Sequence, residues 1–382
     1  MQTYLLIIIL FMFNRRSITG LIQPIRIIKK NSINSIRYIN MKSSSVGARD
    51  SLVEVNVKGA FVRSDSIFRD VISIEHDIYK PESNRYHLYI ANACPWANRC
   101  LTVLHLKGLE NVIDVSIVHP TWQKTKHDDP NDEHKGWTFA ADSSTVFQSS
   151  TGYGSFGSEG CTNDKVNNFR TIRDIYEQNG CNGPKFTVPI LYDTKTNKIV
   201  NNESSEIIRI FNTAFNEYAT KKELDLYPEN LRGKIDDVNN WIYHDINNGV
   251  YKCGFAQSQE AYDDACDKLY DALDKVEDIL SNNRYLTGNI LTEADIRLFM
   301  TLVRFDEVYV VYFKCNKKQI KEYEKIINYC RELYQIPEIK RTIHMEHIKM
   351  HYFTSHPVLN PYSVIPKGPN AIANFLLPHN RG

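Results

Sequence analysis

One cysteine of this sequence stands where a thiol would become reactive. Cys94 is followed by Pro95, Trp96 and Ala97, and the motif lies between a strand-like run and an amphipathic stretch. Proline is favoured in the first turn of a helix, so we expect Cys94 at a helix N-terminus, where free N–H groups and the helix dipole favour a thiolate. Position 97 is alanine, so the motif has no resolving thiol. A mixed disulfide formed at Cys94 would need an external thiol to release it.

The alternative for Cys94 is a buried structural cysteine, which is what we expect of the other seven cysteines. The eight cysteines form no Cys-x-x-Cys pair and have no regular spacing, which argues against a disulfide framework and a zinc module and favours a reducing compartment. They are Cys94, Cys100, Cys161, Cys181, Cys253, Cys266, Cys315 and Cys330.

Two further segments indicate which external thiol this is. A cis bond between Val188 and Pro189, inside a strand-like run, would turn the Val188 backbone outward to pair with a peptide. Glu203 and Ser204 open a predicted helix, whose amides and hydroxyl can hold a carboxylate while Glu203 holds an ammonium. Alone, Glu-Ser is more often a plain helix cap. A γ-glutamyl group carries both charges, so the expected thiol is glutathione.

The elements around these residues alternate between strand and helix. Their order is βαβ and then αββα, which is the thioredoxin-like layout, with a proline inside the first strand of the second half. The predicted strands cover residues 86–90, 112–118, 187–191 and 199–200, and the amphipathic or helical stretches cover 95–107, 166–178 and 204–211.

The second half of the chain is predicted to be helical. Apolar residues recur at three- and four-residue spacing over 262–280, and residues 292–295 form a capping box. The fold class is therefore an α/β N-terminal thioredoxin-like domain plus an all-α C-terminal helical-bundle domain. We predict the thioredoxin-like glutathione-binding domain at 46–213, a linker at 214–227, the α-helical substrate domain at 228–352, and a proline-rich C-terminal extension at 353–382 that wraps the surface.

Composition is that of a soluble globular protein of two or three domains. The 382 residues are 42% hydrophobic and 24% charged, and 46 basic residues balance 45 acidic ones. A net charge of +1 gives no whole-chain field for nucleic acid or an anionic membrane. We therefore expect no nucleic-acid partner and no stable membrane insertion.

The first 45 residues resemble a targeting segment or a disordered extension. An apolar run at 4–13, too short to span a bilayer, precedes basic residues and no acid before Asp50. A mitochondrial, other organellar or secretory address is compatible with this composition, and translation from Met41 is the alternative. The expected location is cytoplasmic or mitochondrial.

Several longer motifs make the sequence recognisable. From about residue 60 to 370 the chain closely resembles the Xi-class glutathione transferases, the glutathionyl-hydroquinone reductases. The resemblance rests on ACPWANRCLTVLHLKGLE, GWTF, TVPIL, IVNNESSEIIRIFN, NNGVYK, RFDEVY and HYFTSH, of which the last three separate the class from omega-type transferases. Members of this family are homodimers that use glutathione, without a metal, to remove the glutathionyl group from glutathionyl-hydroquinones, giving the hydroquinone and glutathione disulfide.

The resemblance also implies roles for individual residues. Cys94 matches the nucleophile, Tyr251 the proton donor, and Tyr309 and Tyr352 match tyrosines that help to tune Cys94. The residues implied to bind glutathione are Trp137, Lys185, Phe186, Thr187, Val188, Glu203 and Ser204. The chain departs from the family pattern at Asn98, where a histidine is common, and in a polar insert at 124–135.

Three other hypotheses remain at this point. An omega-like thiol transferase or dehydroascorbate reductase would use the same cysteine on other acceptors, and a non-enzymatic protein would bind glutathione or a quinone without turnover. A metal site is the third, because His344, His347, His351 and His356 cluster in the sequence, but no acidic ligand is spaced with them and we expect no metal.

Overall fold

The structure is a computed structural model that describes residues 54–56, 58–183 and 185–381. Contacts divide the chain into residues 1–45 and residues 46–382, and every described residue belongs to the second unit. The predicted targeting segment therefore lies outside the described residues. No helix in the described ranges is both long and apolar enough to cross a membrane.

A four-stranded sheet forms the centre of the N-terminal part, and its strands follow the order β2-β1-β7-β8. All five residues of β1 are buried, as expected of a central strand covered on both faces. Leu88 lies opposite Val115 in the parallel neighbour and opposite Leu191 in the antiparallel one. The strands are β1 (Tyr86–Ile90), β2 (Asp114–Ile117), β7 (Ile190–Asp193) and β8 (Lys198–Asn201).

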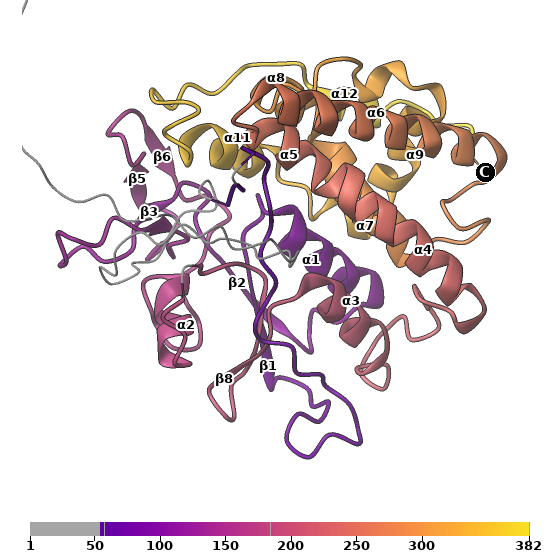
Figure 1. Ribbon diagram of the computed structural model, residues 1–382. Helices are drawn as coiled ribbons and strands as arrows, with labels where there is room; N and C mark the ends of the chain where they lie inside the picture. The colour runs from indigo at the N-terminus through magenta and orange to yellow at the C-terminus, as the bar shows by residue number, and fades with distance from the viewer. Residues whose placement is uncertain (1–53, 57, 184, 382) are drawn as a thin grey trace, which may run out of the picture. The chain divides into compact units, whose positions relative to one another are not determined.

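Three helices cover this sheet. The helices α1 (Pro95–Lys107) and α3 (Ser204–Thr213) pack together on one face, and α2 (Ile172–Gln178) lies on the other, as Figure 1 shows. Helix α1 begins directly after Cys94 and ends at Gly108, whose φ of 68° is the left-handed conformation that glycine adopts most readily. The predicted thioredoxin-like fold class is thus confirmed.

Helix α2 is shorter than the amphipathic stretch predicted at 166–178. It begins only at Ile172, after a capping box in which Thr171 and Asp174 bond each other's backbone N–H groups. Upstream, Asn168 has a φ of 57°, which cannot continue a helix, and the Asp164 carboxylate accepts three backbone N–H bonds. Side chains that bond nearby backbone groups compete with helix formation.

The polar insert at 124–135 is the loop of a small hairpin. Its ends, β3 (Gln123–Lys124) and β4 (Lys135–Gly136), pair antiparallel, and a second hairpin joins β5 (Val146–Gln148) to β6 (Ser155–Gly157). Ion pairs of Asp132 with Arg173 at 2.7 Å and of Lys126 with Glu177 at 2.9 Å attach the insert to α2. The insert therefore folds back onto the domain.

The C-terminal part is helical, as predicted. Its longest helix is α6 (Gln259–Asn282), which includes the predicted 262–280, and Thr292 and Asp295 form the predicted capping box of α7. Two short π-helices, η3 (Tyr243–Asn247) and η4 (Phe305–Tyr309), were not predicted. The other elements are η2 (Glu229–Leu231), α4 (Arg232–Ile242), α5 (Gly249–Phe255), α7 (Glu293–Arg304), α8 (Val310–Tyr312), η5 (Ile320–Glu322), α9 (Glu324–Gln335), α10 (Pro337–Lys340), α11 (Met345–Thr354) and α12 (Ala371–Phe375).

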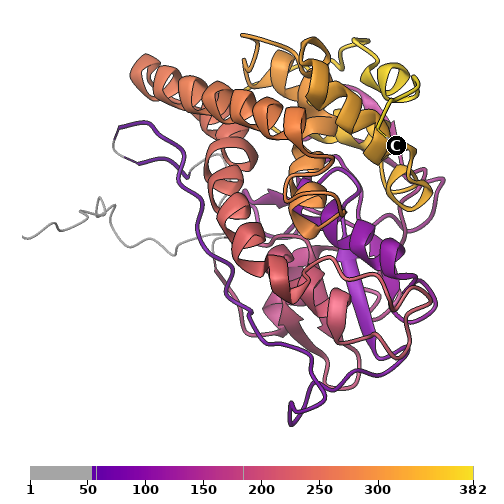
Figure 2. The same ribbon diagram turned by 90° about the vertical axis from the view of Figure 1, so that its right-hand side faces the viewer.

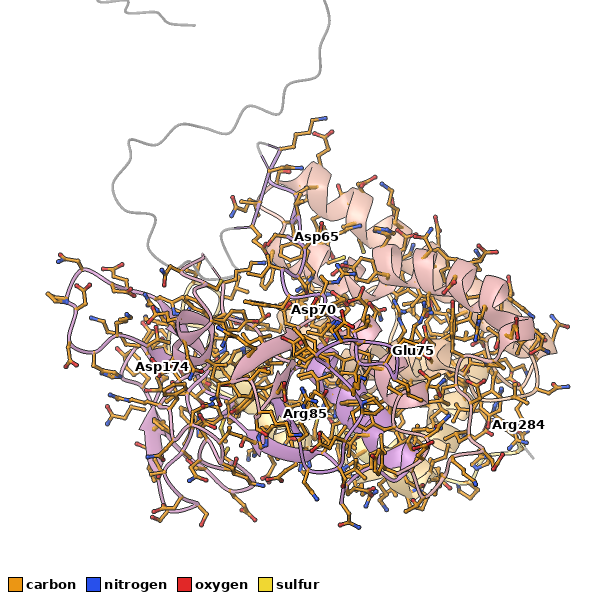
Figure 3. All side chains as sticks on the ribbon, turned by 90° about the horizontal axis from the view of Figure 1, so that it is seen from below. Asp65, Asp70, Glu75, Arg85, Asp174 and Arg284 are labelled. Atoms are coloured by element: carbon orange, nitrogen blue, oxygen red, sulfur yellow. The ribbon has the colours of Figure 1, made fainter. Side chains whose placement is uncertain are left out.

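An N-terminal arm, residues 58–72, runs along both parts. The backbone N–H of Gln257, in the loop before α6, donates to the carbonyl of Gly59, and the backbone N–H of Asp70 donates to the carbonyl of Val200 in β8. Figure 2 shows this indigo segment beside both parts, and Figure 3 marks its course by Asp65 and Asp70. The arm therefore borders the space between the sheet and the helices.

The C-terminal extension includes a helix that was not predicted. In α12, Ala371 and Phe375 are buried, and the Ala371 N–H donates to the carboxylate of Glu307 at 2.6 Å. Phe375 packs against Tyr334 of α9, with ring centroids 5.7 Å apart. This part of the extension is anchored to the helical core.

Candidate active site

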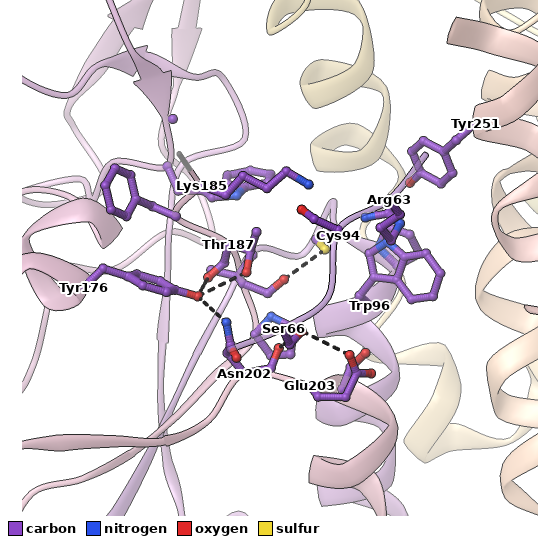
Figure 4. A pocket seen from close by; sticks show the side chains of 18 of the residues that line it. Arg63, Ser66, Cys94, Trp96, Tyr176, Lys185, Thr187, Asn202, Glu203 and Tyr251 are labelled. Atoms are coloured by element: carbon purple, nitrogen blue, oxygen red, sulfur yellow. Dashed lines mark hydrogen bonds between the residues drawn. The ribbon is translucent and has the colours of Figure 1, made fainter. Parts of the chain in front are cut away.

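A cavity of about 370 Å³ lies between the thioredoxin-like part and the helices (Figure 4). This volume is in the range of small-molecule sites. Ten of the eleven residues predicted for the site line it, namely Cys94, Trp137, Lys185, Phe186, Thr187, Val188, Glu203, Ser204, Tyr251 and Tyr352. The eleventh, Tyr309, is fully buried and hydrogen-bonded to Tyr352.

Cys94 is the N-cap residue of α1, with Pro95 in the first turn. Its side chain is 8% exposed, and its thiol donates to the carbonyl of Val188 at 3.5 Å. The Val188–Pro189 bond is cis. The thiol and the backbone expected to pair with a peptide are therefore adjacent.

The protonation of Cys94 differs from the sequence expectation of a lowered pKa. Burial raises the pKa of the Cys94 thiol, and this effect outweighs the backbone N–H groups of Ala97 and Trp96 and the charges of Arg304 and Arg63, which lower it. The helix N-terminus acts in the predicted direction, but the sequence does not reveal how deeply the Cys94 side chain is buried. The thiolate is thus opposed by desolvation and supported by amides and cations.

Glu203 and Ser204 form one end of the cavity, at the start of α3. Arg99 donates to the Ser204 hydroxyl at 2.6 and 3.0 Å and lies 3.6 Å from the Glu203 carboxylate. Burial raises the pKa of Glu203, but Arg99 and hydrogen bonds from Ser205 and Ser66 outweigh it, so the net pKa is lowered. The ionised Glu203 carboxylate can bind an ammonium group, and the N–H groups at the start of α3 can bind a carboxylate next to it.

Lys185 places a cation in the same cavity and forms an ion pair with Glu54, at the N-terminal end of the described residues. Burial lowers the pKa of Lys185, while Glu54 raises it. The second oxygen of the Glu54 carboxylate is buried without a hydrogen-bond partner. Glu54 therefore occupies the position at which an incoming carboxylate would meet Lys185.

A hydrogen-bond network fixes the segment that carries Val188. The Tyr176 hydroxyl donates to the Thr187 carbonyl at 3.1 Å and accepts from Asn202 at 2.8 Å, as the dashed lines of Figure 4 show. Phe186 packs edge-on against Tyr176, with ring centroids 5.5 Å apart. Burial raises the pKa of Tyr176, so its hydroxyl stays protonated and keeps donating.

Trp137 follows β4 and enters the cavity from the side of the hairpins. Its ring stacks on that of His351, with centroids 4.5 Å apart, and meets the ring of Trp122 edge-on, with centroids 5.5 Å apart. These contacts hold a buried indole at the cavity wall, where a flat apolar surface can pack against a peptide ligand.

Three tyrosines from α5, η4 and α11 form a connected cluster. The Tyr352 hydroxyl lies 2.7 Å from that of Tyr251 and 3.1 Å from that of Tyr309. Burial raises the pKa of Tyr251, and it raises the pKa values of Tyr309 and Tyr352 well above the usual value. All three phenols therefore remain protonated and can donate.

Arg63 of the arm lies among aromatic rings at the cavity. Its guanidinium carbon is 4.8 Å from the centroid of Trp96 and 5.1 Å from that of Tyr251, and its Nε donates to Asn248 at 2.9 Å. Within the described ranges no carboxylate lies within ion-pair distance of it. Aromatic faces beside an unpaired cation suit a flat, electron-rich or anionic ligand.

Asn98 and Arg304 lie behind the cysteine. The Asn98 side chain donates to the Thr342 carbonyl at 2.7 Å and accepts from Arg304 at 3.0 Å. Arg304 also donates to the carbonyls of Asn92 and Ala93, directly before Cys94. The residue that departs from the family pattern thus joins α1 to the helical part.

The histidines considered for a metal site contact different partners. His347 is bonded to the Glu159 carbonyl at 2.6 Å and His351 to the Pro120 carbonyl at 2.9 Å, while His356 stacks against Tyr312. Among the residues that the structure describes, no group of three histidine, cysteine, aspartate or glutamate side chains is placed to hold a metal ion.

Comparison with known proteins decides the family. The model of the glutathione S-transferase N-terminal domain matches residues 93–214, and that of the C-terminal domain matches residues 259–332. The chain is 44% identical over 319 residues to the glutathionyl-hydroquinone reductase YqjG of Escherichia coli, covering 81% of this chain and 89% of that protein. The crystal structure of the glutathione-S-transferase Xi from Phanerochaete chrysosporium matches with a TM-score of 0.76 and 43% identity, over 88% of this chain and all of that one. The chain belongs to the Xi class of glutathione transferases.

Two further similarities concern this Xi-class transferase. The Xi glutathione transferase ECM4 from Saccharomyces cerevisiae, solved in complex with glutathione, matches with a TM-score of 0.71 and 38% identity over 80% of this chain and 98% of that one. A Schizosaccharomyces pombe protein named glutathione S-transferase omega-like 2 is 43% identical over 319 residues, 81% of this chain and 94% of that protein. Relatives under both names therefore share most of this chain.

Sequence reasoning missed several residues of the transferase's site. Arg63 and Ser66 lie on an arm for which no element was predicted, and Tyr176 and Arg99 lie on helices whose buried face was not assigned to the site. Arg304 stands in the recognised RFDEVY motif, directly before the π-helix η4, and only the tertiary structure shows that it reaches Cys94's loop.

Proposed function

We propose that this Xi-class transferase is a glutathionyl-hydroquinone reductase. It removes the glutathionyl group from a glutathionyl-hydroquinone and releases the hydroquinone and glutathione disulfide. The observation that carries the proposal is one cavity lined by a cysteine at a helix N-terminus and by a protonated tyrosine, Cys94 and Tyr251. The names of the relatives support the same activity.

The glutathionyl group is bound by the thioredoxin-like part. Glu203 takes the ammonium of the γ-glutamyl end, and Ser204 with the first amides of α3 takes its carboxylate. The Val188 backbone pairs with the cysteinyl residue, and Lys185 takes the glycyl carboxylate after leaving Glu54. Trp137, Phe186 and Thr187 complete the wall against which the peptide packs.

In the first step the Cys94 thiolate attacks the sulfur of the substrate. A sulfur–sulfur bond forms between Cys94 and the glutathionyl group, and the carbon–sulfur bond breaks with its electron pair left on the ring carbon. Tyr251 donates a proton to that carbon, and the hydroquinone leaves. The aryl ring lies on the helical side, beside Trp96, Tyr251 and Arg63.

In the second step a glutathione thiolate attacks the Cys94 mixed disulfide. Glutathione disulfide forms, and Cys94 leaves as a thiolate. The sum is one glutathionyl-hydroquinone and one glutathione converted to one hydroquinone and one glutathione disulfide. Because position 97 is alanine, no intramolecular thiol of the motif competes with this glutathione.

The assembly follows from the resemblance alone, and the location follows from the composition of residues 1–45. We propose a homodimer, as in the family, and a cytoplasmic or mitochondrial protein whose N-terminal 45 residues supply the address. Import of a fusion of residues 1–45 to a fluorescent protein tests the address.

An omega-like thiol transfer is the second candidate function. It is favoured by the relatives named omega-like and by the absence of a resolving cysteine, since Cys94 can take a glutathionyl group from any accessible mixed disulfide. A protein that only binds glutathione or a quinone would not need a proton donor, and the protonated Tyr251 in the cavity of Cys94 therefore favours an enzyme.

Turnover separates these possibilities. The purified chain from residue 41 is given a glutathionyl-hydroquinone and glutathione, and both products are quantified beside Cys94→Ala. The proposal expects equal amounts of hydroquinone and glutathione disulfide from the wild type and none above background from the variant. Turnover of dehydroascorbate or a mixed disulfide, without hydroquinone release, would favour the omega-like activity.

A further inference from the structure

Arg304 is a buried cation without a carboxylate partner. Its side chain is fully buried, and it donates to the carbonyls of Met300 at 2.7 Å, Ala93 at 3.2 Å and Asn92 at 3.4 Å. Its fourth partner is the neutral amide oxygen of Asn98 at 3.0 Å. Across the part of the chain that the structure describes, no aspartate or glutamate lies within 4.0 Å of its guanidinium.

The other buried arginines of the described residues differ from Arg304 in this respect. Each has a carboxylate within ion-pair distance, in the pairs Arg85–Asp193, Arg99–Glu203, Arg173–Asp132 and Arg297–Glu293. A guanidinium is protonated throughout the physiological range, and burying its charge without a counter-charge is unfavourable. Of these five buried arginines only Arg304 lacks a counter-charge, and it lies next to the loop that precedes Cys94.

The ionisable groups around Arg304 are acids that are neutral at rest. The four acids on which its charge acts are Cys94 at the start of α1, Tyr251 of α5, Tyr309 of η4 and Tyr352 of α11. The Arg304 charge lowers the pKa of each, against the raising effect of burial. The charge of Arg63 on the arm also lowers the pKa of Cys94, and the charge of Arg304 lowers the pKa of His351 on α11.

We propose that Arg304 is the permanent counter-charge for the anion that forms at Cys94 during the reaction, and that it holds the Asn92–Ala93 backbone in place for that anion. Arg304 is thus a positioning residue that acts through Cys94. The inference rests on Cys94 being the nucleophile of the proposed function. It also gives Asn98 a role, since a neutral amide bonds Arg304 without neutralising it.

A purely structural role would depend on the hydrogen bonds of Arg304 and not on its charge. Asn98→Asp separates the two, because it keeps an oxygen acceptor for Arg304 while adding a negative charge. Both Asn98→Asp and the matched control Asn98→Ala lose the hydrogen bond to Thr342. Only Asn98→Asp neutralises the guanidinium.

The readout is the pH dependence of Cys94 alkylation by iodoacetamide, followed by mass spectrometry of the peptide that contains Cys94. It needs neither glutathione nor a hydroquinone, so it stays interpretable if the proposed activity fails. We expect the apparent pKa of Cys94 to rise by about 1–3 units in Asn98→Asp and in Arg304→Gln, the shift typical of losing an adjacent opposite charge. Asn98→Ala should stay close to the wild type.

Equal profiles for Asn98→Asp and Asn98→Ala would overturn the inference, and so would a Cys94 that is alkylated at no pH. If the variants do not fold, as judged by circular dichroism, the wild type provides the test. The apparent pKa of Cys94 should be the same in low and high salt, because a buried charge is not screened. A rise with salt would assign the counter-charge to a solvent-accessible cation such as Arg63 and contradict the inference.

Discussion

The hydroxyl groups of Tyr251 and Tyr352 lie 2.7 Å apart, although the two residues belong to different helices, α5 and α11. Tyr352 also lies 3.1 Å from Tyr309, so it stands between the other two phenols. A proton that Tyr251 gives to a leaving group can be replaced along this chain. We therefore propose that Tyr352 supports Tyr251 as the proton donor, which is a more specific role than the tuning of Cys94 implied by the family resemblance.

Tyr352→Phe should therefore slow the release of hydroquinone without weakening glutathione binding. We expect kcat to fall by about tenfold, and by about a hundredfold in Tyr251→Phe, because general acid catalysis contributes at least that much. Steady-state kinetics and glutathione titration measure the two effects. An equal loss of glutathione affinity in both variants would mean that the tyrosines bind the peptide and do not donate protons.

Asn98→His should leave most of the activity intact at neutral pH. A neutral imidazole has one donor and one acceptor, as the amide does, so it can bond the Thr342 carbonyl and Arg304 in the same way. A protonated imidazole has no acceptor and adds a second positive charge. Asn98→His should thus lose activity at low pH, where the wild type does not. Identical pH–rate profiles would contradict the view that a neutral side chain at position 98 bonds Arg304.

Removing the charge of Glu54 should tighten glutathione binding. Glu54 pairs with Lys185, the residue proposed to bind the glycyl carboxylate of glutathione, so that carboxylate would have to displace Glu54. Glu54→Gln should lower the Kd of glutathione about two- to fivefold, as expected from the 0.2–1 kcal/mol of a partly exposed ion pair. Isothermal titration calorimetry measures the change, with Lys185→Met, which should raise the Kd, as the matched control. An unchanged Kd in Glu54→Gln would show that the ion pair does not compete with glutathione.

Local sequence signals were enough to predict much of this site. The start of α1 at Cys94 and its end at Gly108 depend on proline and glycine, whose effects on the backbone are local. The family and the two-part fold, predicted from motifs such as NNGVYK and HYFTSH, are confirmed by the comparisons. The roles of the individual site residues remain predictions.

The remaining features depend on contacts between distant segments. Arg304 and Ala93 are far apart in the sequence, and no local pattern indicates their hydrogen bond. The same holds for Arg63, whose arm gains structure by pairing with β8 and with the loop before α6. The raised pKa of Cys94 is a third case, because it comes from burial by several elements.

Stability should fall as the pH drops from about 6.5 toward 4. Burial and, to a smaller extent, the charge of Arg173 lower the pKa of His134 to about 4, so the folded state favours the neutral ring. The unfolded chain, with a histidine pKa of about 6.5, binds more protons in this window, so this contribution is complete above pH 6.5 and is lost as the pH falls.

Denaturant unfolding at several pH values measures this loss. His134→Asn should reduce the slope of the free energy of unfolding against pH by up to about 1.4 kcal/mol per pH unit, which corresponds to one proton. His76, which is more exposed, provides the control substitution. An unchanged slope in His134→Asn would show that this histidine has the same pKa in the folded and unfolded states, which would contradict the prediction.

The most direct test of the account is a single turnover without free glutathione. The wild-type chain is mixed with one equivalent of a glutathionyl-hydroquinone, and the protein and the released aryl product are analysed by mass spectrometry and chromatography. We predict that one glutathionyl group becomes attached to Cys94 as one equivalent of hydroquinone is released, and that added glutathione then removes it as glutathione disulfide. Hydroquinone release only after glutathione is added, with no adduct on Cys94, would contradict the mechanism.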